Sequence, residues 1–513
     1  MANTINIPKA HVLLALSLPL AVVIGYFLAE PMELSSIAMV VLVLGVLCIP
    51  LMLRWYHPLL VASWNAAISP MFLPGRPSLW SLLAFTGLLF GLLSRAVNPK
   101  AQFLNVPAIT RPLLALTAVV IVTAMLTGGA GLHVFGSETF GGKKYFYIMA
   151  AVAGYFALTS RRIPEHRAGL YVALFFLSGL TSAAADLAYA AGPQFRFLLA
   201  LFSPDYASDQ ANLDQSLTIH DTGMVRMGGL GWLGTAGYAF LLARYGIRGS
   251  LDLHRPWRLL LLLLAFVAGL GGGFRSFVVL FGLTCVVLFF LEGLHRTRYL
   301  PALLGVCLLG GAILLPHGDK LPLVAQRSLC FLPGRFDSLA VESARVSTGW
   351  RVEMWKQVLP EVPTYLFRGK GYALDANDLY MAIESGNRFG GESLSGTILA
   401  GDYHSGPLSI VIPFGIYGVI AFMWLLVAGL RVLYRNFKWG SPALRRINAL
   451  LFASFAARAF FFFVGFGSLH SDLANFLGLL GLAVALNSAE ATVAEEANQP
   501  APESSLRTQY IRV

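Results

Sequence analysis

One histidine and a small set of cations are the residues of this chain whose types and positions could support chemistry. His404, in GDYHSGPL, lies just before an apolar run long enough to cross a bilayer. A histidine can take up a proton near neutral pH, which is the ordinary task of a general base. Arginine stays charged in a low dielectric and binds phosphate through paired hydrogen bonds. The candidate cations are Arg226, Arg275, Arg351, Lys370 and Arg458.

Each of these residues also has an ordinary structural explanation. Arg226 and Arg275, at helix mouths, could reach to lipid headgroups. Arg458 lies inside an apolar run, where a salt bridge or a carbonyl contact would explain it. Arg351 could be solvated, and His404 could be a satisfied interfacial histidine. The functional explanation gains weight because the expected topology places all of them on one side of a membrane, where a lipid-linked phosphate or diphosphate would fit.

The remaining chemical classes have little support. No HExxH, CxxC, paired-aspartate or Walker-type glycine pattern occurs, so we expect neither a metal ion nor another cofactor. The four cysteines form no disulfide framework. The net charge of +11 could suggest a nucleic acid, but the basic residues lie at helix ends instead of forming a stripe. We therefore expect no nucleic-acid partner.

The elements that must position these side chains are membrane helices. The chain has 513 residues, of which 57% are hydrophobic and 12% charged, a composition outside the range of soluble proteins. Apolar runs of roughly 16 to 25 residues recur, close to the ~20 that a helix needs to cross a bilayer. The sequence predicts an all-α polytopic membrane protein with about 12–14 transmembrane helices. The weakest of these is 57–74, interrupted by Trp64, Asn65 and Pro70, which could be re-entrant or interfacial.

Charge distribution predicts the orientation. Clusters of Arg and Lys between the apolar runs fall on one side, which is cytoplasmic by the positive-inside rule. Both termini are then cytoplasmic, and the two long hydrophilic segments lie outside. We expect N-terminal transmembrane helices (1–190), a periplasmic loop (191–226), central transmembrane helices (227–315), a long periplasmic loop with short helices (316–406), C-terminal transmembrane helices (407–488) and a disordered cytoplasmic tail (489–513). There is no internal repeat, although many secondary transporters have one.

Four segments resemble the O-antigen ligase and O-antigen polymerase superfamily of bacterial membrane glycosyltransferases. HSGPLSIVIPFGIYGVIAF resembles its histidine, leucine and Gly-x-x-Gly, here His404, Leu408, Gly415 and Gly418. GGGFRSFVVLFG resembles its small-residue helix start with an arginine, here Arg275. The likeness covers roughly residues 220–430.

The other two segments lie on either side of the second in the chain. VRMGGLGWLG resembles the superfamily's arginine-plus-glycine helix entry, here Arg226. WRVEMWKQVLPEVPTYLFRGKGY resembles its Arg-x-x-x-Trp loop helix, here Arg351 and Trp355, which ends in a Gly-x-Gly. Two positions depart from the pattern: Ser405 replaces the common asparagine, and Pro413 replaces the common acidic residue, which puts the identity of the acceptor in doubt.

The resemblance implies transfer of a glycan from undecaprenyl diphosphate to a hydroxyl acceptor, a lipid or another glycan, at the periplasmic face of a bacterial inner membrane. It implies neither a metal nor a nucleotide sugar. His404 would deprotonate the acceptor, and Arg275 and Arg226 would stabilise the diphosphate. Arg351 would hold the glycan or the second phosphate. Lys370 and Arg458 complete the expected substrate-binding set.

Three alternatives stay open. Within the superfamily, the chain could be a ligase, a polymerase or a protein-glycosylating relative. A transporter or flippase of lipid-linked glycans would suit the number of spans, with Asp186 as the carboxylate to couple it to ions. A scaffold subunit of an export complex would leave the outer cations unexplained.

Overall fold

The computed structural model describes residues 34–70, 73, 75–97, 103–131, 140–202, 227–375, 377, 378, 380 and 394–497, with Pro19, Ala21, Val22 and Gly25. The chain divides into two units, Met1–Tyr56 and His57–Val513. Helix α2 (Leu34–Ser63) crosses the boundary between them. All that follows concerns the larger unit.

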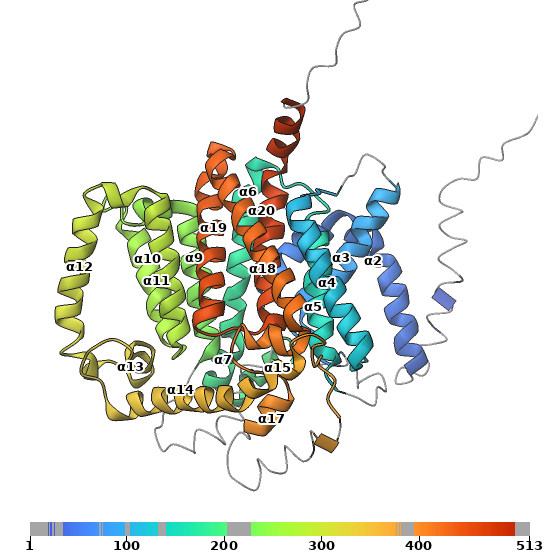
Figure 1. Cartoon of the computed structure of the whole chain (residues 1–513). Coiled ribbons are helices and arrows are strands. Elements are labelled where there is room, and N and C mark those ends of the chain that lie inside the picture. Colours follow the sequence, from blue (N-terminus) through green and yellow to red (C-terminus); the bar gives the residue numbers. More distant parts are fainter. Residues whose placement is uncertain are drawn as a thin grey trace, which may run out of the picture. The chain divides into compact units, whose positions relative to one another are not determined.

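Helices dominate this unit, as the sequence predicts (Figure 1). They are α3 (Leu79–Val97), α4 (Pro107–Thr127), α5 (Gly142–Leu158), α6 (Ala168–Leu177), α7 (Ser182–Ala191), α9 (Gly228–Ser250), α10 (Pro256–Leu270), α11 (Arg275–Leu291), α12 (Tyr299–Leu314), α18 (Leu408–Trp439), α19 (Arg445–Val464) and α20 (Leu469–Ala497). Among the described residues, six helical segments are long and apolar enough to cross a membrane, and α10, α11 and α12 are shorter apolar helices. The all-α membrane architecture is confirmed, and the full number of crossings stays a prediction.

The expected span at 57–74 is not a helix of its own. Residues 57–63 complete α2, and the chain then leaves the helix at Trp64. The buried indole of Trp64 donates to the carbonyl of Ala474 in α20 (3.1 Å), and the amide of Asn65 donates to the carbonyl of Phe175 (2.8 Å). These side chains bind the segment into the bundle, so the residues that interrupt the apolar run are the ones that anchor it.

The first apolar run, His11 to Ala29, is expected from the sequence to be a membrane helix, but it falls almost wholly outside the described residues and stays a prediction. One further boundary differs from the expected one. Helix α20 continues to Ala497 and so includes the first nine residues of the segment 489–513 that is expected to be a disordered tail. Residues 498–513 lie outside the described part of the chain.

The hydrophobic core extends through the bundle and includes a cluster of aromatic rings from its C-terminal helices. Phe422 of α18, Phe455 and Phe462 of α19 and Phe476 of α20 are fully buried and pack ring against ring. Tilted and edge-to-face pairs of this kind stabilise by about 0.5–1.5 kcal/mol beyond their burial. The start of α20 is thereby fixed against α18 and α19.

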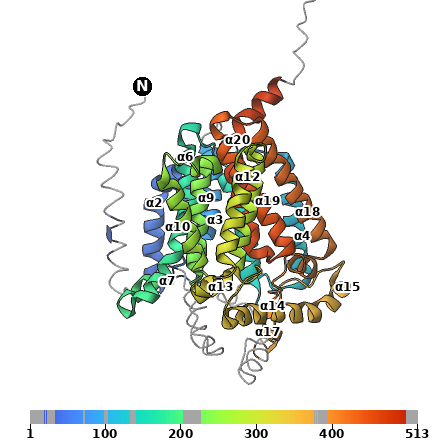
Figure 2. The same cartoon turned by 90° about the vertical axis from the view of Figure 1, so that its left-hand side faces the viewer.

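Shorter helices lie across one end of the bundle (Figures 1 and 2). They are α13 (Leu323–Leu329), α14 (Ser338–Val358), α15 (Val362–Tyr365) and α17 (Leu394–Leu399). Helix α14 lies across the ends of α18 and α19 in Figure 1, and Asp337 caps it by accepting a hydrogen bond from the Leu339 N–H (2.8 Å). With 21 residues, α14 is longer than the short helices expected in this loop.

The predicted basic clusters meet at the other end of the bundle. Arg446, after α18, donates to the carbonyl of Arg244 near the end of α9 (3.1 Å). The N–H of Ile163, between α5 and α6, donates to the carbonyl of Ala485 far along α20 (2.8 Å). Helix α18 spans 32 residues, or about 48 Å, between the two ends.

Candidate functional site

His404 lies in the loop before α18, held between two aromatic rings. Its centroid is 5.2 Å from that of Trp350 in α14 and 5.2 Å from that of Phe466. Its φ is +46°, in the left-handed region that non-glycine residues seldom adopt and that costs on the order of 1–3 kcal/mol. The indole N–H of Trp355 donates to the carbonyl of Tyr403 (2.9 Å) and fixes the preceding peptide. The surrounding packing thus imposes one orientation on this imidazole.

Arg275 and Arg351 are brought to the same face of α14. Arg275, the first residue of α11, donates through Nη2 to the hydroxyl of Thr348 (3.0 Å) and reaches the carbonyl of Ala344 (3.4 Å). Arg351 follows Thr348 by three residues, so both lie on one side of the helix. The guanidinium of Arg351 lies over the ring of Phe466, 5.6 Å from its centroid. One aromatic ring therefore contacts both His404 and Arg351.

A lysine from α5 completes the charged cluster. Lys144 forms an ion pair with Asp402 (Nζ to Oδ1, 2.8 Å) and also donates to the carbonyl of Ala400. Its ammonium lies over the ring of Tyr372, 5.3 Å from the centroid. Asp402 is two residues from His404, so this pair ties the histidine loop to the first turn of α5.

The electrostatics of the cluster favour a neutral imidazole. Burial is the largest cause that lowers the pKa of His404 below its ordinary value of 6.5, and the charge of Arg351 lowers it further. The Asp402 carboxylate acts in the opposite direction, and Lys144 adds to the lowering. Burial, with the nearby Arg275, also lowers the pKa of Arg351. A neutral imidazole can accept a proton, and guanidiniums beside it can stabilise a phosphate charge.

The other expected site residues lie elsewhere. Lys370 pairs with Glu361 (3.2 Å) and lies over the ring of Tyr365. Arg458 pairs with Asp472 of α20 (Nη1 to Oδ1, 3.5 Å). Arg226 lies outside the described residues. The structure thus brings His404, Arg275 and Arg351 together and gives Lys370 and Arg458 partners of their own.

The glycines of the resembling segments have a clear structural task. Helix α18 kinks at Gly415, whose φ is +63°. The segment that follows α15 lies against this kink. Its Lys370 and Gly371 N–H groups donate to the carbonyls of Ile412 (2.8 Å) and Pro413 (3.0 Å) in α18. In the other direction, the Ile416 N–H of α18 donates to the carbonyl of Leu366 (2.7 Å). The kink frees backbone groups of the helix, and the loop satisfies them. These hydrogen bonds hold the start of α18, and with it His404, against the segment that follows α15.

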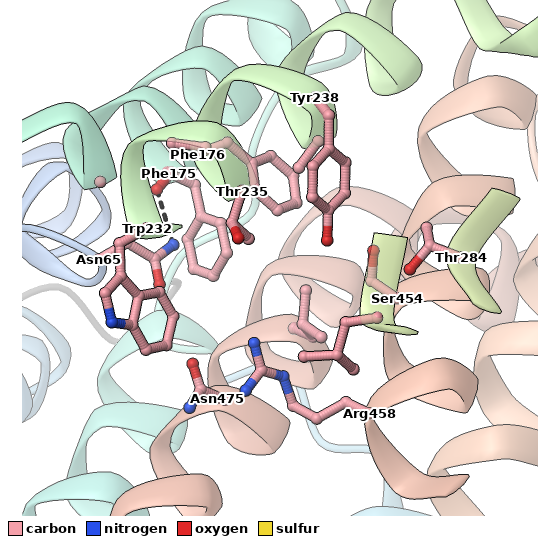
Figure 3. Close-up of a pocket in the computed structure, with 15 residues that line it drawn as sticks. Asn65, Phe175, Phe176, Trp232, Thr235, Tyr238, Thr284, Ser454, Arg458 and Asn475 are labelled. Atoms are coloured by element: carbon pink, nitrogen blue, oxygen red, sulfur yellow. Dashed lines mark hydrogen bonds between the residues drawn. The ribbon is translucent and has the colours of Figure 1, made fainter. Parts of the chain in front are cut away.

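Arg458 points into a cavity inside the bundle (Figure 3). The cavity walls carry polar groups among apolar ones, including Asn475, Ser454 and Thr284. Its volume is about 60 Å³, whereas one water needs about 10–15 Å³ on the same measure. The cavity thus has room for a few waters and is too small for a sugar ring.

The sequence does not single out three residues of the cluster, Lys144, Asp402 and Phe466. Asp402 had a detectable signal, since it shares GDYHSG with His404. Lys144 and Phe466 are distant along the chain, and nothing in their local patterns indicates this end of the bundle. Within the described residues, no group of three or more His, Cys, Asp or Glu side chains could hold a metal ion.

Neither a scan against protein-family models nor a search of curated proteins gave a match for this chain.

Proposed function

We propose that this protein is an integral membrane glycosyltransferase that moves a glycan from undecaprenyl diphosphate to a hydroxyl acceptor at the periplasmic face of a bacterial inner membrane, in the manner of an O-antigen ligase. The observation that carries the proposal is the cluster of His404, Arg351 and Arg275 at one end of the bundle. The glycosyl-transfer reaction needs one base and a stabilised diphosphate leaving group. The cluster supplies residue types for both.

In the proposed reaction, Nδ1 or Nε2 of His404 takes the proton of the acceptor hydroxyl as its oxygen attacks the anomeric carbon. The bond from that carbon to the diphosphate oxygen breaks, and the electron pair leaves with the diphosphate. Arg275 and Arg351 stabilise the negative charge that develops there, with Arg226 as a further candidate. The aromatic walls and the burial of His404 keep the imidazole neutral and ready to accept the proton.

The direct test is transfer from purified undecaprenyl-diphosphate glycan by the full-length protein in liposomes. Replacing His404 with alanine should lower the rate by about 10²–10⁴-fold, because it removes the general base. A His404→Ala protein with nearly full activity would end the proposal of a base at this position. Arg275→Lys separates charge from geometry, because lysine lacks the guanidinium fork.

Products distinguish the members of the superfamily. Glycan on lipid A–core would indicate a ligase, a ladder of repeat units on the carrier a polymerase, and glycan on protein a protein-glycosylating enzyme. All three share the proposed base and phosphate contacts.

A lipid-linked glycan flippase is the second candidate, because the bundle buries an ion pair between Arg458 and Asp472. Intramembrane carboxylates can couple transport to ions. A flippase should lose function in Asp472→Asn and keep it in His404→Ala. The glycosyltransferase proposal expects the histidine variant to be the more severely impaired.

A further inference from the structure

The turn between α19 and α20, residues 465–468, forms one wall of the candidate site. Its Phe466 contacts both groups that the proposed reaction needs: the ring lies 5.2 Å from the His404 ring and 5.6 Å from the Arg351 guanidinium. A cation over an aromatic face is attracted to the ring electrostatically. The ring also covers part of the imidazole and keeps water from it. The position of Phe466 therefore affects the orientation of the Arg351 guanidinium and the solvation of the His404 imidazole.

A buried ion pair holds this turn from inside the bundle. Asp472, in the first turn of α20, accepts from the Ser468 N–H through Oδ2 (2.9 Å) and from Arg458 Nη1 through Oδ1 (3.5 Å). The side chains of Arg458 and Asp472 are only 18% and 15% exposed. The carboxylate thus connects the cavity wall of Figure 3, which carries Arg458, to the backbone two residues after Phe466.

The same turn is tied to the histidine loop. The Leu469 N–H donates to the hydroxyl of Ser409 (3.1 Å), and the Ser409 N–H donates to the carbonyl of Ser405 (2.9 Å). Ser405 directly follows His404. The histidine and the phenylalanine that packs on it are therefore fixed to one another through backbone and side-chain hydrogen bonds.

We propose that Phe466 is a positioning residue for His404 and Arg351, and that the Arg458–Asp472 ion pair holds it in place through the Ser468 backbone. The proposal rests on the proposed function in taking His404 as the base. It gives Arg458 a task that does not require contact with substrate. A guanidinium in a cavity of about 60 Å³ has no room for a glycan, but it is placed to hold a carboxylate.

The groups around His404 determine whether its pKa rises or falls when the Phe466 ring is removed. Arg351 of α14 and Lys144 of α5 disfavour the charged imidazole, and Asp402 of its own loop favours it. His470 of α20 lies in the same region, with Nδ1 2.9 Å from the Ser468 hydroxyl. Removing the Phe466 ring admits water to the imidazole and frees Arg351 to move away. Both changes raise the pKa of His404 toward 6.5.

The experiment measures that pKa directly, by NMR of histidine-labelled full-length protein in nanodiscs, with the His404 signal assigned by its loss in His404→Gln. We expect Phe466→Ala and Asp472→Asn each to raise the pKa of His404 by about half a unit or more. Phe466→Tyr, which keeps the ring, should leave it near the native value. Asn475→Ala is the matched control, because Asn475 lines the same cavity one turn beyond Asp472.

An unchanged pKa in Phe466→Ala would overturn the positioning role, and an unchanged pKa in Asp472→Asn would overturn the role of the ion pair. If Asp472→Asn does not fold, Arg458→Gln tests the same ion pair from its other side. In the transfer assay, the positioning proposal expects Arg458→Gln to shift the acidic limb of the rate profile to higher pH. A rise in KM with no shift of the pKa would instead assign Arg458 to substrate binding.

The two proposals fail separately. The NMR measurement needs no catalysis, so a protein that shows the pKa shifts but transfers no glycan would refute the glycosyltransferase and leave the positioning role intact. An active enzyme in which Phe466→Ala leaves the pKa of His404 unchanged would refute the positioning role and leave the glycosyltransferase proposal intact.

Discussion

His404 has a strained backbone and two aromatic neighbours, one of which also contacts the Arg351 guanidinium. A strained residue persists where its surroundings hold it, and such residues gather at functional sites. The sequence predicts this histidine and the two arginines near it because their types suit phosphate chemistry and their segments end at one membrane face. It does not predict Phe466 or Lys144, since their roles depend on which helices become neighbours.

The first prediction concerns the pH dependence of transfer. Because the pKa of His404 lies below 6.5, the rate should fall only as the pH drops below that value. Arg351→Gln removes a positive charge that lowers this pKa, so the acidic limb of kcat/KM should move to higher pH. The maximal rate should also fall by about 10²–10³-fold.

Arg345→Gln is the control for this change. Arg345 lies on α14 as well, but its side chain is 81% exposed and meets only Glu342, at 3.9 Å, among the described residues. Its profile should match that of the native enzyme. An acidic limb that stays in place in Arg351→Gln would show that Arg351 does not act on the histidine.

The kink of α18 is the feature on which the position of the histidine loop depends. Apolar periodicity and length predict most helices to within a few residues, because the bilayer requires long apolar runs. The kink is not predictable in this way, although Pro413 and Gly415 mark where it could occur. The loop whose backbone groups form hydrogen bonds with the kinked helix lies about forty residues earlier in the chain. Local sequence carries no information on that pairing.

The second prediction tests the kink. An alanine at Gly415 would have to adopt φ of +63°, and its Cβ would lie 2.5 Å from the carbonyl oxygen of Leu366. Gly415→Ala should therefore destabilise the protein by roughly 1–3 kcal/mol and lower its unfolding temperature in detergent. Gly282→Ala in α11 is the matched control, because nothing lies within 4 Å of the added methyl. Equal unfolding temperatures for the two variants would contradict the strain.

The third prediction concerns the attachment of α13 and α14 to the bundle. Arg327 of α13 is 5% exposed and donates to the carbonyl of Gly273 (2.5 Å) and to the hydroxyl of Ser343 in α14 (3.0 Å). Arg327→Met leaves these acceptors without that donor, at a cost of about 1–3 kcal/mol. Amide hydrogen exchange in α13 and the first turns of α14 should become faster. Arg335→Met, at an exposed side chain of the same loop, should leave exchange unchanged.

For the whole molecule, the two ends of the bundle differ in kind. One end carries α14, the histidine loop and Lys144, and the other carries contacts between basic loops such as Arg446 to Arg244. Charge counting predicts which loops share an end, because charged segments do not cross the bilayer easily. It also predicts the side of the membrane that each end faces, which is open to direct measurement.

The fourth prediction is that orientation. In a variant without the four native cysteines, Arg345→Cys on α14 should react with a membrane-impermeant maleimide added to intact spheroplasts. Ser441→Cys, between α18 and α19, should react only after the membrane is permeabilised. The reverse pattern would place the candidate site in the cytoplasm and rule out a periplasmic reaction.

Among the described residues of the candidate site, Arg275, Arg351 and Lys144 carry positive charge, and Asp402 forms an ion pair with Lys144 alone of the three. Such an excess of positive charge attracts small oxyanions from the medium as readily as it attracts a lipid diphosphate. Inorganic phosphate and sulfate should therefore act as competitive inhibitors, and turnover measured in phosphate buffer should be slower than in a zwitterionic buffer adjusted with chloride to the same ionic strength.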